Sequence, residues 1–439
     1  MSDFQLPTNE TEFHKNFAQI KPLMNATMAY YESARCLFCY DAPCVKACPT
    51  EIDIPLFIRQ ISTGDTQGSA KTIYASNYFG NICGKVCPTE VLCEGACVYN
   101  HQGVKPIEIG RLQSFATTHV IEKDLDVVEI DQSSEMKVAI VGAGPAGIAC
   151  ACELRLHGIQ VDIFEAKSLP SGLALYGTAP YKVTNEEVLK EVEWLQSQFG
   201  FSIHYNRPIS DRASIAELED QYDAIFLGIG LGQTRSVGME GEELPQCIGA
   251  AELIEQLKID PLSVNMGSRV VVIGGGNTAM DAASESARMG SEATLLYRRS
   301  KDEMGAYDFE YDLAKSVGAK AIFNTDVKKI VEENGHLVVH CEKNNSHKSA
   351  EKIDTDTSFE IECDMVIKAT GQLKQTELLD LFNLQYDQGG RIVVDGHTYQ
   401  CSQKKYFAGG DAVNGGAEVV NACAEGKKAA MGIIEYLAS

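Results

Sequence analysis

The chain has 439 residues, of which 44% are hydrophobic and 23% charged, and this length suffices for two to four globular domains. Its 38 basic and 61 acidic residues give a formal net charge of −23. That charge argues against non-specific binding to nucleic acid or to anionic membranes, because both require a positive surface. No apolar stretch approaches the ~20 residues of a membrane span, and the N-terminus lacks the basic and apolar regions of a signal peptide. We therefore expect a cytoplasmic protein that contacts neither a membrane nor nucleic acid.

The first 35 residues are predicted to form a helical lead-in. Phe13, Phe17, Ile20 and Leu23 are spaced so that they share one helix face. We expect this segment to contribute packing and no chemistry.

Cysteine is frequent and clustered in the next hundred residues. Eight of the 15 cysteines lie between residues 36 and 97, and the odd total disfavours a disulfide framework. The first four have the spacing C-x2-C-x4-C-x3-C-P, close to that of two-cluster bacterial ferredoxins. The two groups are Cys36, Cys39, Cys44 and Cys48, and Cys83, Cys87, Cys93 and Cys97.

This spacing predicts two [4Fe-4S] clusters. In the ferredoxin pattern the fourth cysteine binds the other cluster, so Cys48 would join Cys87 and Cys93. Cys97 would complete the cluster of the first three cysteines, and spacing alone nominates Cys83 as the last ligand. A four-cysteine zinc site is the alternative, because thiolates at short spacing also bind zinc.

Two further segments lie between the two groups of cysteines, and a third follows them. Short helices are expected over residues 54–58 and 70–74, where they would shield the clusters from water. Residues 121–135 are acidic and polar, which is typical of a linker.

Residues 138–147, VAIVGAGPAG, predict a dinucleotide site. An apolar strand ends in G-x-G-x-x-G and passes directly into a helix, so backbone N–H groups and the helix dipole would face a pyrophosphate. A second apolar strand over residues 160–164 ends in Glu165, where a ribose-binding acid is expected. The alternative is a glycine-rich turn in an unrelated α/β fold. C-x-C at Cys150 and Cys152 is not a C-x-x-C redox pair and suits helix–sheet packing.

The same pattern returns further along the chain. The strand over 269–273 leads into GGGNTA at 274–279, and the strand over 293–297 is followed by Arg298 and Arg299. An acid after this strand suits a free ribose 2′-hydroxyl, whereas arginine suits a 2′-phosphate. Solvated surface charge is the alternative for the arginine pair. Two such units predict one FAD site and one nicotinamide site.

The C-terminal third is expected to complete the FAD-binding fold. A strand over 364–371 ends in A-T-G, a strand over 406–411 ends in G-G-D, and the last helix begins after residue 415. The Asp411 carboxylate could accept hydrogen bonds from flavin ribityl hydroxyls, and the helix start could face the flavin N1–C2=O edge. The FAD candidates are Gly142, Gly144, Pro145, Ala146, Gly147, Glu165, Gly172, Leu173, Ala369, Thr370, Gly371, Gly410, Asp411, Ala417, Glu418 and Val419. The nicotinamide candidates are Gly274, Gly275, Gly276, Asn277, Thr278, Ala279, Arg298 and Arg299.

We therefore predict an α/β fold with two Rossmann-like dinucleotide-binding domains, the second inserted in the first, preceded by a helical two-cluster iron–sulfur domain. The expected boundaries are 1–130 for the iron–sulfur domain, 131–240 and 371–439 for the FAD domain, and 241–370 for the NAD(P)H domain.

The chain resembles the electron-input half of dihydropyrimidine dehydrogenase and the separate flavin and iron–sulfur subunit that bacteria use with a pyrimidine-reducing partner. It is more distantly similar to the small subunit of NADPH-dependent glutamate synthase. The shared motifs are RCLFCYDAPCVKACPTEIDIPLFI, CGKVCPTEVLCEGAC, KPIEIGRLQSFA, VAIVGAGPAG and IGGGNTAMDAA. The resemblance covers nearly the whole chain.

The resemblance changes one ligand assignment. In the pyrimidine enzymes a glutamine, matched here by Gln113, replaces one cysteine ligand, which would leave Cys83 a bystander. The implied ligand sets are Cys36, Cys39, Cys44 and Cys97 for one cluster and Cys48, Cys87, Cys93 and Gln113 for the other.

The resemblance also implies a function. FAD would take hydride from NADPH or NADH without an acid–base residue, and single electrons would pass through the two clusters to an FMN-containing partner subunit that reduces uracil or thymine to 5,6-dihydropyrimidines. The FMN barrel and reactive cysteine of the full-length enzyme have no counterpart here, so the chain should not reduce a pyrimidine alone. The alternatives are a glutamate synthase small subunit and a scaffold with degenerate nucleotide folds.

Overall fold

The computed structural model of the chain describes residues 4–130, 133–344 and 358–439. The chain forms two compact units, which we call the large and the small unit. The large unit consists of residues 19–178, 182–231 and 374–439. The small unit consists of the residues up to 18, residues 179–181 and residues 232–373.

Short helices build the first part of the large unit. Three of them begin at a side-chain cap, with Asn25, Asp53 and Asp65 accepting a backbone N–H in the first turn. Apolar side chains from these helices, including the fully buried Phe57 and Ile58, form one core with the cysteines. The helices are α2 (Ala26–Ala34), α3 (Pro43–Lys46), α4 (Ile54–Ser62), α5 (Thr66–Ser76), α6 (Gly80–Val86) and α7 (Ile109–Glu122).

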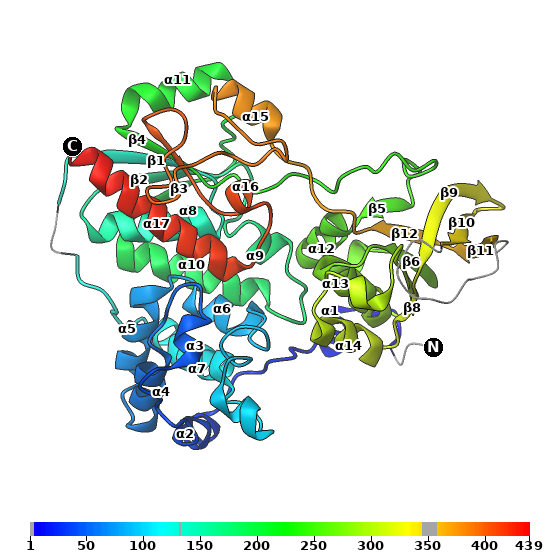
Figure 1. Cartoon of the computed structure of the whole chain (residues 1–439), viewed down its shortest axis with the longest axis horizontal. Helices are drawn as coiled ribbons and strands as arrows, with labels where there is room; N and C mark the ends of the chain where they lie inside the picture. Colours follow the sequence, from blue (N-terminus) through cyan, green and yellow to red (C-terminus); the bar gives the residue numbers. More distant parts are fainter. Residues whose placement is uncertain (1–3, 131–132, 345–357) are drawn as a thin grey trace. The chain divides into compact units, whose positions relative to one another are not determined.

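A five-stranded parallel sheet forms the rest of the large unit (Figure 1). Its inner strands are buried on both faces, as their continuous apolar sequence predicts. The strand order is β13 (Tyr406–Ala408), β4 (Ala224–Leu227), β1 (Lys137–Val141), β2 (Gln160–Phe164) and β3 (Ser202–His204). The helices are α8 (Pro145–Leu156), α9 (Leu173–Tyr176), α10 (Asn185–Phe199), α11 (Arg212–Gln221), α15 (Thr376–Leu381), α16 (Asp411–Asn414) and α17 (Val419–Leu437).

The last helix, α17, packs closely along α8 (Figure 1). A Cβ at Gly426 would lie 2.1 Å from the carbonyl oxygen of Ala146, so only glycine permits this approach. The end of the chain thus lies against the helix that follows the first glycine-rich loop.

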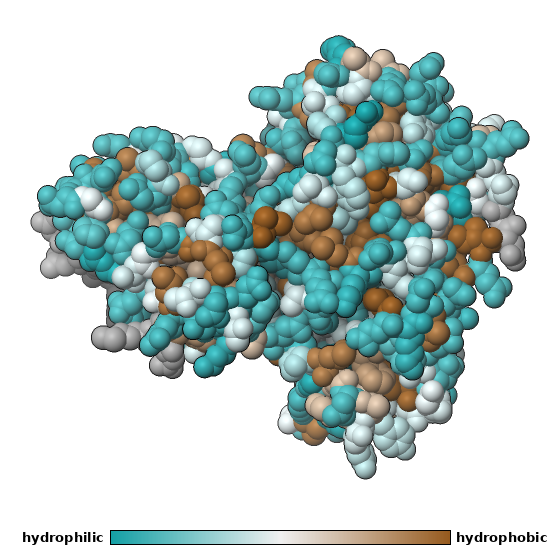
Figure 2. All heavy atoms as spheres, turned by 180° about the vertical axis from the view of Figure 1, so that it is seen from behind, coloured by the Kyte–Doolittle hydropathy of each residue, from teal (hydrophilic) through white to brown (hydrophobic). Residues whose placement is uncertain are grey.

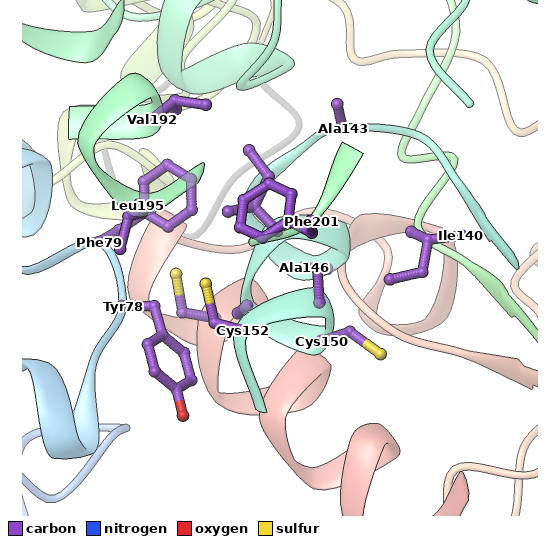
Figure 3. Close-up of a cluster of buried hydrophobic side chains, with 14 of the residues drawn as sticks. Tyr78, Phe79, Ile140, Ala143, Ala146, Cys150, Cys152, Val192, Leu195 and Phe201 are labelled. Atoms are coloured by element: carbon purple, nitrogen blue, oxygen red, sulfur yellow. The ribbon is translucent and has the colours of Figure 1, made fainter. Parts of the chain in front are cut away.

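One apolar core joins the short helices to this sheet. Figure 3 shows Tyr78 and Phe79 in the same cluster as Cys152 of α8 and Val192 and Leu195 of α10. The core therefore runs without a break from the cysteine-bearing helices to the first dinucleotide-binding sheet.

A second five-stranded parallel sheet forms the small unit. Its strand order is β5 (Cys247–Gly249), β12 (Met365–Lys368), β6 (Arg269–Ile273), β7 (Glu292–Leu296) and β8 (Lys320–Ile322). The accompanying helices are α12 (Ala250–Ile259), α13 (Asn277–Arg288) and α14 (Asp308–Ser316).

A three-stranded antiparallel sheet follows, which the sequence analysis does not anticipate. Asn334 and Gly335, both with positive φ, make the tight turn between its first two strands. The strands are β9 (Thr325–Glu333), β10 (His336–Lys343) and β11 (Ser358–Cys363).

The prediction for the N-terminal lead-in is wrong in part. The segment forms α1 (Glu10–Asn16) and α2, with an irregular stretch between them. Phe13 and Phe17 are buried in the core of the small unit, whereas Ile20 and Leu23 are exposed. The carbonyl oxygen and the side chain of Asn16 hydrogen-bond Arg288 of α13, so this segment packs with the nicotinamide candidates.

One further expectation differs from the structure, and another lies partly outside the described residues. The strand before A-T-G, expected to support the FAD fold, is β12 and pairs with β6 and β5 of the second sheet instead. The expected linker over 121–135 begins after α7 and includes residues 131–132, which lie outside the described residues.

Hydrophilic side chains cover much of the face seen in Figure 2, with apolar groups between them. No helix in the described ranges is long and apolar enough to span a bilayer.

Candidate functional site

A single pocket in the large unit gathers four cysteines from two distant stretches of the sequence. Cys36, Cys39, Cys44 and Cys97 all line this pocket. These are the four residues that the ferredoxin spacing assigns to one cluster. Its other lining residues are mostly apolar, among them Ile54, Pro55, Ile58, Val98, Tyr99, Ile107 and Ile109.

The loop that carries the first two of these cysteines is held in an unusual conformation. Phe38 has φ of +50°, which is uncommon for an aromatic residue. The guanidinium of Arg59 lies 4.7 Å from the centre of its ring, and Tyr99 donates a hydrogen bond to the carbonyl oxygen of Arg35 (2.7 Å). These contacts hold a backbone conformation that turns both cysteines into the pocket.

The second set of cysteines also lies together. Electrostatic interactions link Cys87 with Cys48 and Cys93, and Cys93 with Cys48. Cys87 ends helix α6, and its carbonyl oxygen accepts a hydrogen bond from Lys21 Nζ (3.3 Å). Burial raises the pKa of Cys93, as it raises that of Cys44 to about 12, so both thiols are protonated unless a metal ion displaces the proton.

Two further residues compete for the remaining ligand position. Gln113 on α7 is buried, and its amide nitrogen donates to the carbonyl oxygen of Gly80 (2.7 Å). That bond fixes the amide and leaves its oxygen as the atom available to a metal. Cys83 is also buried, and its thiol interacts with those of Cys87 and Cys423.

No group of three or more His, Cys, Asp or Glu side chains within the described ranges is arranged to hold a single metal ion.

The first glycine-rich loop forms a tight cradle at the end of β1. A Cβ at Gly142 would lie 2.5 Å from the carbonyl oxygen of Gly228, and a Cβ at Gly147 would lie 2.0 Å from that of Gly142. The backbone can therefore approach a pyrophosphate closely, and Pro145 opens α8 at its N-terminus.

The residues expected beside this loop are found there. One carboxylate oxygen of Glu165 accepts the N–H of Ala143 (2.8 Å). The N–H of Ser171 donates to the carbonyl oxygen of Ala143 (2.7 Å), and a Cβ at Gly172 would lie 3.3 Å from Cα of Gly144. The 171–173 stretch thus lies on the glycine-rich loop.

The G-G-D segment from the C-terminal part reaches the same place. A Cβ at Gly410 would lie 3.0 Å from the side chain of Ala146, and Asp411 Oδ1 accepts the N–H of Ala417 (3.1 Å). Burial raises the pKa of Asp411, and Lys374 opposes that rise. The structure therefore brings together candidates that lie more than 260 residues apart in the sequence.

Glu425 of α17 is a functional candidate that the sequence analysis missed. Its carboxylate accepts the N–H of Gly410 (2.7 Å) and the side-chain amide of Asn414 (3.1 Å). Glu425 thus holds both ends of the segment that contains Asp411. Its position seven residues after Glu418, on the same helix face, was the available signal.

The second glycine-rich loop lies at the end of β6 in the small unit. A Cβ at Gly274 would lie 2.5 Å from the carbonyl oxygen of Ala369, so the A-T-G segment adjoins this loop. The Asn277 side chain accepts the N–H of Tyr307 (3.0 Å), and Thr370 donates its hydroxyl to the carbonyl oxygen of Arg235 (2.7 Å). These bonds fix the turns around the candidate nicotinamide site.

The residue that corresponds to Glu165 in this second site is Tyr297. Val141 pairs with Phe164 and Ile273 pairs with Leu296, so the two sheets have equivalent register and Glu165 and Tyr297 both follow the second strand directly. The sequence analysis placed the arginine pair there, one residue too early. The ring of Tyr297 covers Gly275, where a Cβ would lie 2.3 Å from it.

The two arginines follow Tyr297 at the end of β7. Arg298 is exposed and Arg299 half-buried. Their backbone carbonyl oxygens accept hydrogen bonds from Asn344 and Asn324, and within the described part of the chain neither guanidinium has an ion-pair partner. Two cationic side chains therefore remain available beside the second loop.

Comparison with protein families gives two matches. A family model described as "Pyridine nucleotide-disulphide oxidoreductase" matches residues 136–426. One described as dihydropyrimidine dehydrogenase domain II, 4Fe-4S cluster, matches residues 13–125.

Two curated relatives from one organism match almost end to end. The NAD-dependent dihydropyrimidine dehydrogenase subunit PreT of Escherichia coli (strain K12) is 30% identical over 421 residues, covering 95% of this chain and 97% of its own. The glutamate synthase [NADPH] small chain of the same organism is 30% identical over 446 residues, covering 96% and 94%. Among solved structures, FprA of Mycobacterium tuberculosis in complex with NADPH has a TM-score of 0.57 at 19% identity, covering 70% of this chain and 85% of that one. This last similarity concerns the fold alone.

These matches confirm the predicted resemblance, the α/β fold and the oxidoreductase class. They confirm FAD, a nicotinamide dinucleotide and [4Fe-4S] clusters as the cofactors, and they favour iron–sulfur over the zinc alternative. The chain belongs to the pyridine nucleotide-disulphide oxidoreductase family and carries the 4Fe-4S domain of dihydropyrimidine dehydrogenase in front of it.

Proposed function

We propose that this chain is the electron-input subunit of a two-subunit enzyme that reduces uracil or thymine to the 5,6-dihydropyrimidine. One observation carries the proposal: the same compact unit holds a pocket lined by four cysteines and a glycine-rich cradle for a flavin dinucleotide. The relatives named as dihydropyrimidine dehydrogenase subunits support this choice of substrate. The partner would hold FMN and the pyrimidine. A cytoplasmic location stays a prediction from the sequence.

The chain's own residues would bind and orient the cofactors. Bound FAD accepts hydride from the nicotinamide and gives up single electrons, which the clusters carry onward. The first loop and Glu165 would hold the dinucleotide, and Asp411, fixed through Glu425, would hold the ribityl chain. No acid–base side chain is needed for hydride transfer.

We assign the cluster ligands as two sets of four. Cys83 is left out because its thiol adjoins Cys423, whereas the amide of Gln113 is already oriented by Gly80. The sets are Cys36, Cys39, Cys44 and Cys97, and Cys48, Cys87, Cys93 and Gln113.

We further propose that NADPH is the preferred nucleotide. Tyr297 replaces the acid that would accept a hydrogen bond from a ribose 2′-hydroxyl, and the two arginines beside it are unpaired within the described residues. A doubly charged 2′-phosphate suits such a site.

An anaerobic titration with NADPH and with NADH tests the proposal. We expect bleaching of the flavin at lower NADPH than NADH concentration, EPR signals of reduced clusters, and iron and acid-labile sulfide for two clusters per chain. Zinc without iron or sulfide would refute the scheme. Absence of bleaching with either nucleotide would refute the assignment of the second sheet.

The identity of the partner decides between two relatives. The match to a glutamate synthase small chain is as strong and as complete as that to the pyrimidine enzyme. Reconstitution with an FMN-containing pyrimidine-reducing subunit should give NADPH-dependent loss of uracil. If the chain instead supported glutamate formation with a glutamate synthase large subunit and no loss of uracil was observed, the glutamate synthase alternative would replace this proposal.

A further inference from the structure

Two buried thiols, those of Cys83 and Cys423, lie next to Cys87, a member of the second set of cysteines. The thiol of Cys83 interacts with those of Cys87 and Cys423. Cys83 and Cys423 are each 2% exposed. Cys83 and Cys423 belong to neither of the ligand sets proposed above, so these two thiols have no assigned role.

The thiol of Cys83 reaches a cluster ligand. Cys83 lies on α6 and Cys87 caps the end of that helix four residues later, where its N–H donates to the carbonyl oxygen of Cys83, so the two residues lie one turn apart. Cys87 in turn interacts with Cys48 and Cys93, the other cysteines of its proposed set. A contact with Cys83 is therefore a contact with the edge of that cluster.

Cys423 lies near the proposed flavin-binding segments. Cys423 lies one turn into α17, four residues after Val419, which is a flavin candidate at the helix start. Its neighbour Ala422 would lie 3.7 Å from a Cβ at Gly410, the glycine that precedes Asp411. Cys423 therefore lies in the first turns of α17, one turn after the flavin candidate Val419 and beside a residue that contacts the G-G-D segment.

The surrounding core is apolar and continuous. Tyr78, Phe79 and Cys152, which are labelled in Figure 3, belong to the same buried cluster as Cys83 and Cys423. Electron tunnelling weakens steeply with each unfilled gap, and protein cores at native packing density leave few such gaps. Sulfur is large and polarizable, so a thiol–thiol contact joins the two helices closely.

We propose that the contact between Cys423 and Cys83 is the route by which electrons cross from FAD to the cluster held by Cys87. The inference rests on the proposed function. Each transfer removes one electron from the reduced flavin and converts one ferric ion of the cluster to ferrous. The two thiols stay reduced, and no bond forms between them. Both are positioning residues, since they bridge the cofactors without binding either.

The test follows electron transfer within the FAD- and cluster-loaded chain. After rapid anaerobic mixing with NADPH, absorbance reports reduction of the flavin and freeze-quench EPR reports reduction of the cluster. In Cys423→Ala we expect flavin reduction at the wild-type rate and cluster reduction slowed by about tenfold, because the deleted sulfur leaves a gap of atomic size in the core. In Cys423→Ser, which keeps the contact, most of the rate should return. The midpoint potential of the cluster should not change in either variant.

Cys150→Ala supplies the matched control. Cys150 is fully buried on α8 in the same core, but its interactions include neither Cys83 nor Cys423. Its variant should show the wild-type rate of cluster reduction. Equal rates in Cys423→Ala and Cys150→Ala would overturn the route, and so would a failure of serine to restore the rate.

Cys83→Ala separates this inference from the ligand assignment beneath it. We expect full flavin, iron and sulfide contents with slow cluster reduction. Loss of iron and sulfide from this variant would make Cys83 a ligand and overturn the route. Wild-type protein without clusters would instead refute the proposed function itself.

Discussion

The two dinucleotide-binding sheets share four parallel strands in equivalent order, β4-β1-β2-β3 in one and β12-β6-β7-β8 in the other, yet they carry different side chains at equivalent positions. The fifth strand differs, because β13 comes last along the chain in the first sheet whereas β5 comes first in the second. Each places a glycine-rich loop after its central strand and a second strand beside it, and the residue after that second strand is Glu165 in one sheet and Tyr297 in the other. The scaffold therefore fixes where a dinucleotide can lie. We propose that a few residues at the strand ends decide which dinucleotide binds.

A second difference lies in the loops themselves. The last position of the motif is Gly147 in the first sheet, where a Cβ would meet the carbonyl oxygen of Gly142 at 2.0 Å, and Ala279 in the second. The second loop accommodates that methyl group in a fully buried position. The first helix thus packs closer to its strand than the second does.

The largest effect is expected from Gly147→Ala. The new methyl group overlaps backbone that cannot move away, so the cradle should deform and the purified protein should lose most of its FAD. The measurement is the flavin absorbance per chain.

Ala279→Gly is the matched change in the other sheet. It removes a methyl group and creates no overlap, so flavin content should stay at the wild-type level. A Gly147→Ala protein that retained all its FAD would show that the first loop tolerates the methyl group as the second does, and would contradict the closer packing of the first helix.

A second, smaller effect should separate the nucleotides. Arg298→Ala with Arg299→Ala removes two cations that we assign to the 2′-phosphate, so KM for NADPH should rise by about 10- to 100-fold, as expected for lost charge-assisted hydrogen bonds. KM for NADH, which lacks that phosphate, should change by less than about twofold on the same reasoning. Steady-state reduction of ferricyanide measures both. An equal rise for the two nucleotides would mean that the arginines do not read the phosphate.

The third effect concerns the helices that cross over each sheet. In the first sheet this helix, α10, carries Glu191, a fully buried carboxyl that accepts hydrogen bonds from the N–H groups of Asn81 and Ile82 and from the Tyr74 hydroxyl. These donors lower its pKa, but burial outweighs them and raises it from 4.5 to about 8. In the second sheet the corresponding helix, between β7 and β8, is α14.

Glu191 therefore makes stability depend on pH. Between pH 4.5 and about 8 the folded protein keeps a proton that the unfolded chain has released, so the free energy of unfolding should fall as pH rises through this window. The total loss is on the order of 5 kcal/mol. Glu191→Gln, neutral at every pH, should remove this slope.

Urea unfolding at several pH values measures the slope. The only tryptophan, Trp194, lies 4.7 Å from Tyr74, so its fluorescence reports on this region. The exposed Glu193 on the same helix supplies the control, since Glu193→Gln should keep the wild-type slope. A Glu191→Gln protein with an unchanged slope would refute the assignment.

The predictions from the sequence that agree with the structure rest mostly on local sequence patterns. The strands that lead into both glycine-rich loops were recognised within a residue because apolar strand, turn glycines and helix follow one another directly. The pocket of four cysteines followed from ferredoxin spacing alone, although Cys97 lies far along the chain from the other three.

The failures share a physical cause, which is that distant contacts decide burial and pairing. Phe17 is buried and Ile20 exposed because α1 packs on α13, near Arg288, and no local periodicity encodes that. The strand before A-T-G joined the second sheet for the same reason, since its pairing with β6 depends on residues nearly a hundred positions away. Glu425 and Cys423 gain their roles only once α17 lies against the loops.

The small unit is assembled from three separate stretches of the chain, and this limits how its specificity can be exchanged. Phe13 and Phe17 arrive from the N-terminus and Tyr181 from a three-residue excursion, and the rings of Phe17 and Tyr181 stack with centres 6.5 Å apart. Exchange of residues 232–373 for those of a relative would replace the surfaces that bury these rings. The aromatic side chains would then pack against residues that do not fit them. The small unit is therefore difficult to exchange as a whole between related proteins. We expect nucleotide preference to be changed more readily by point substitutions at the end of β7.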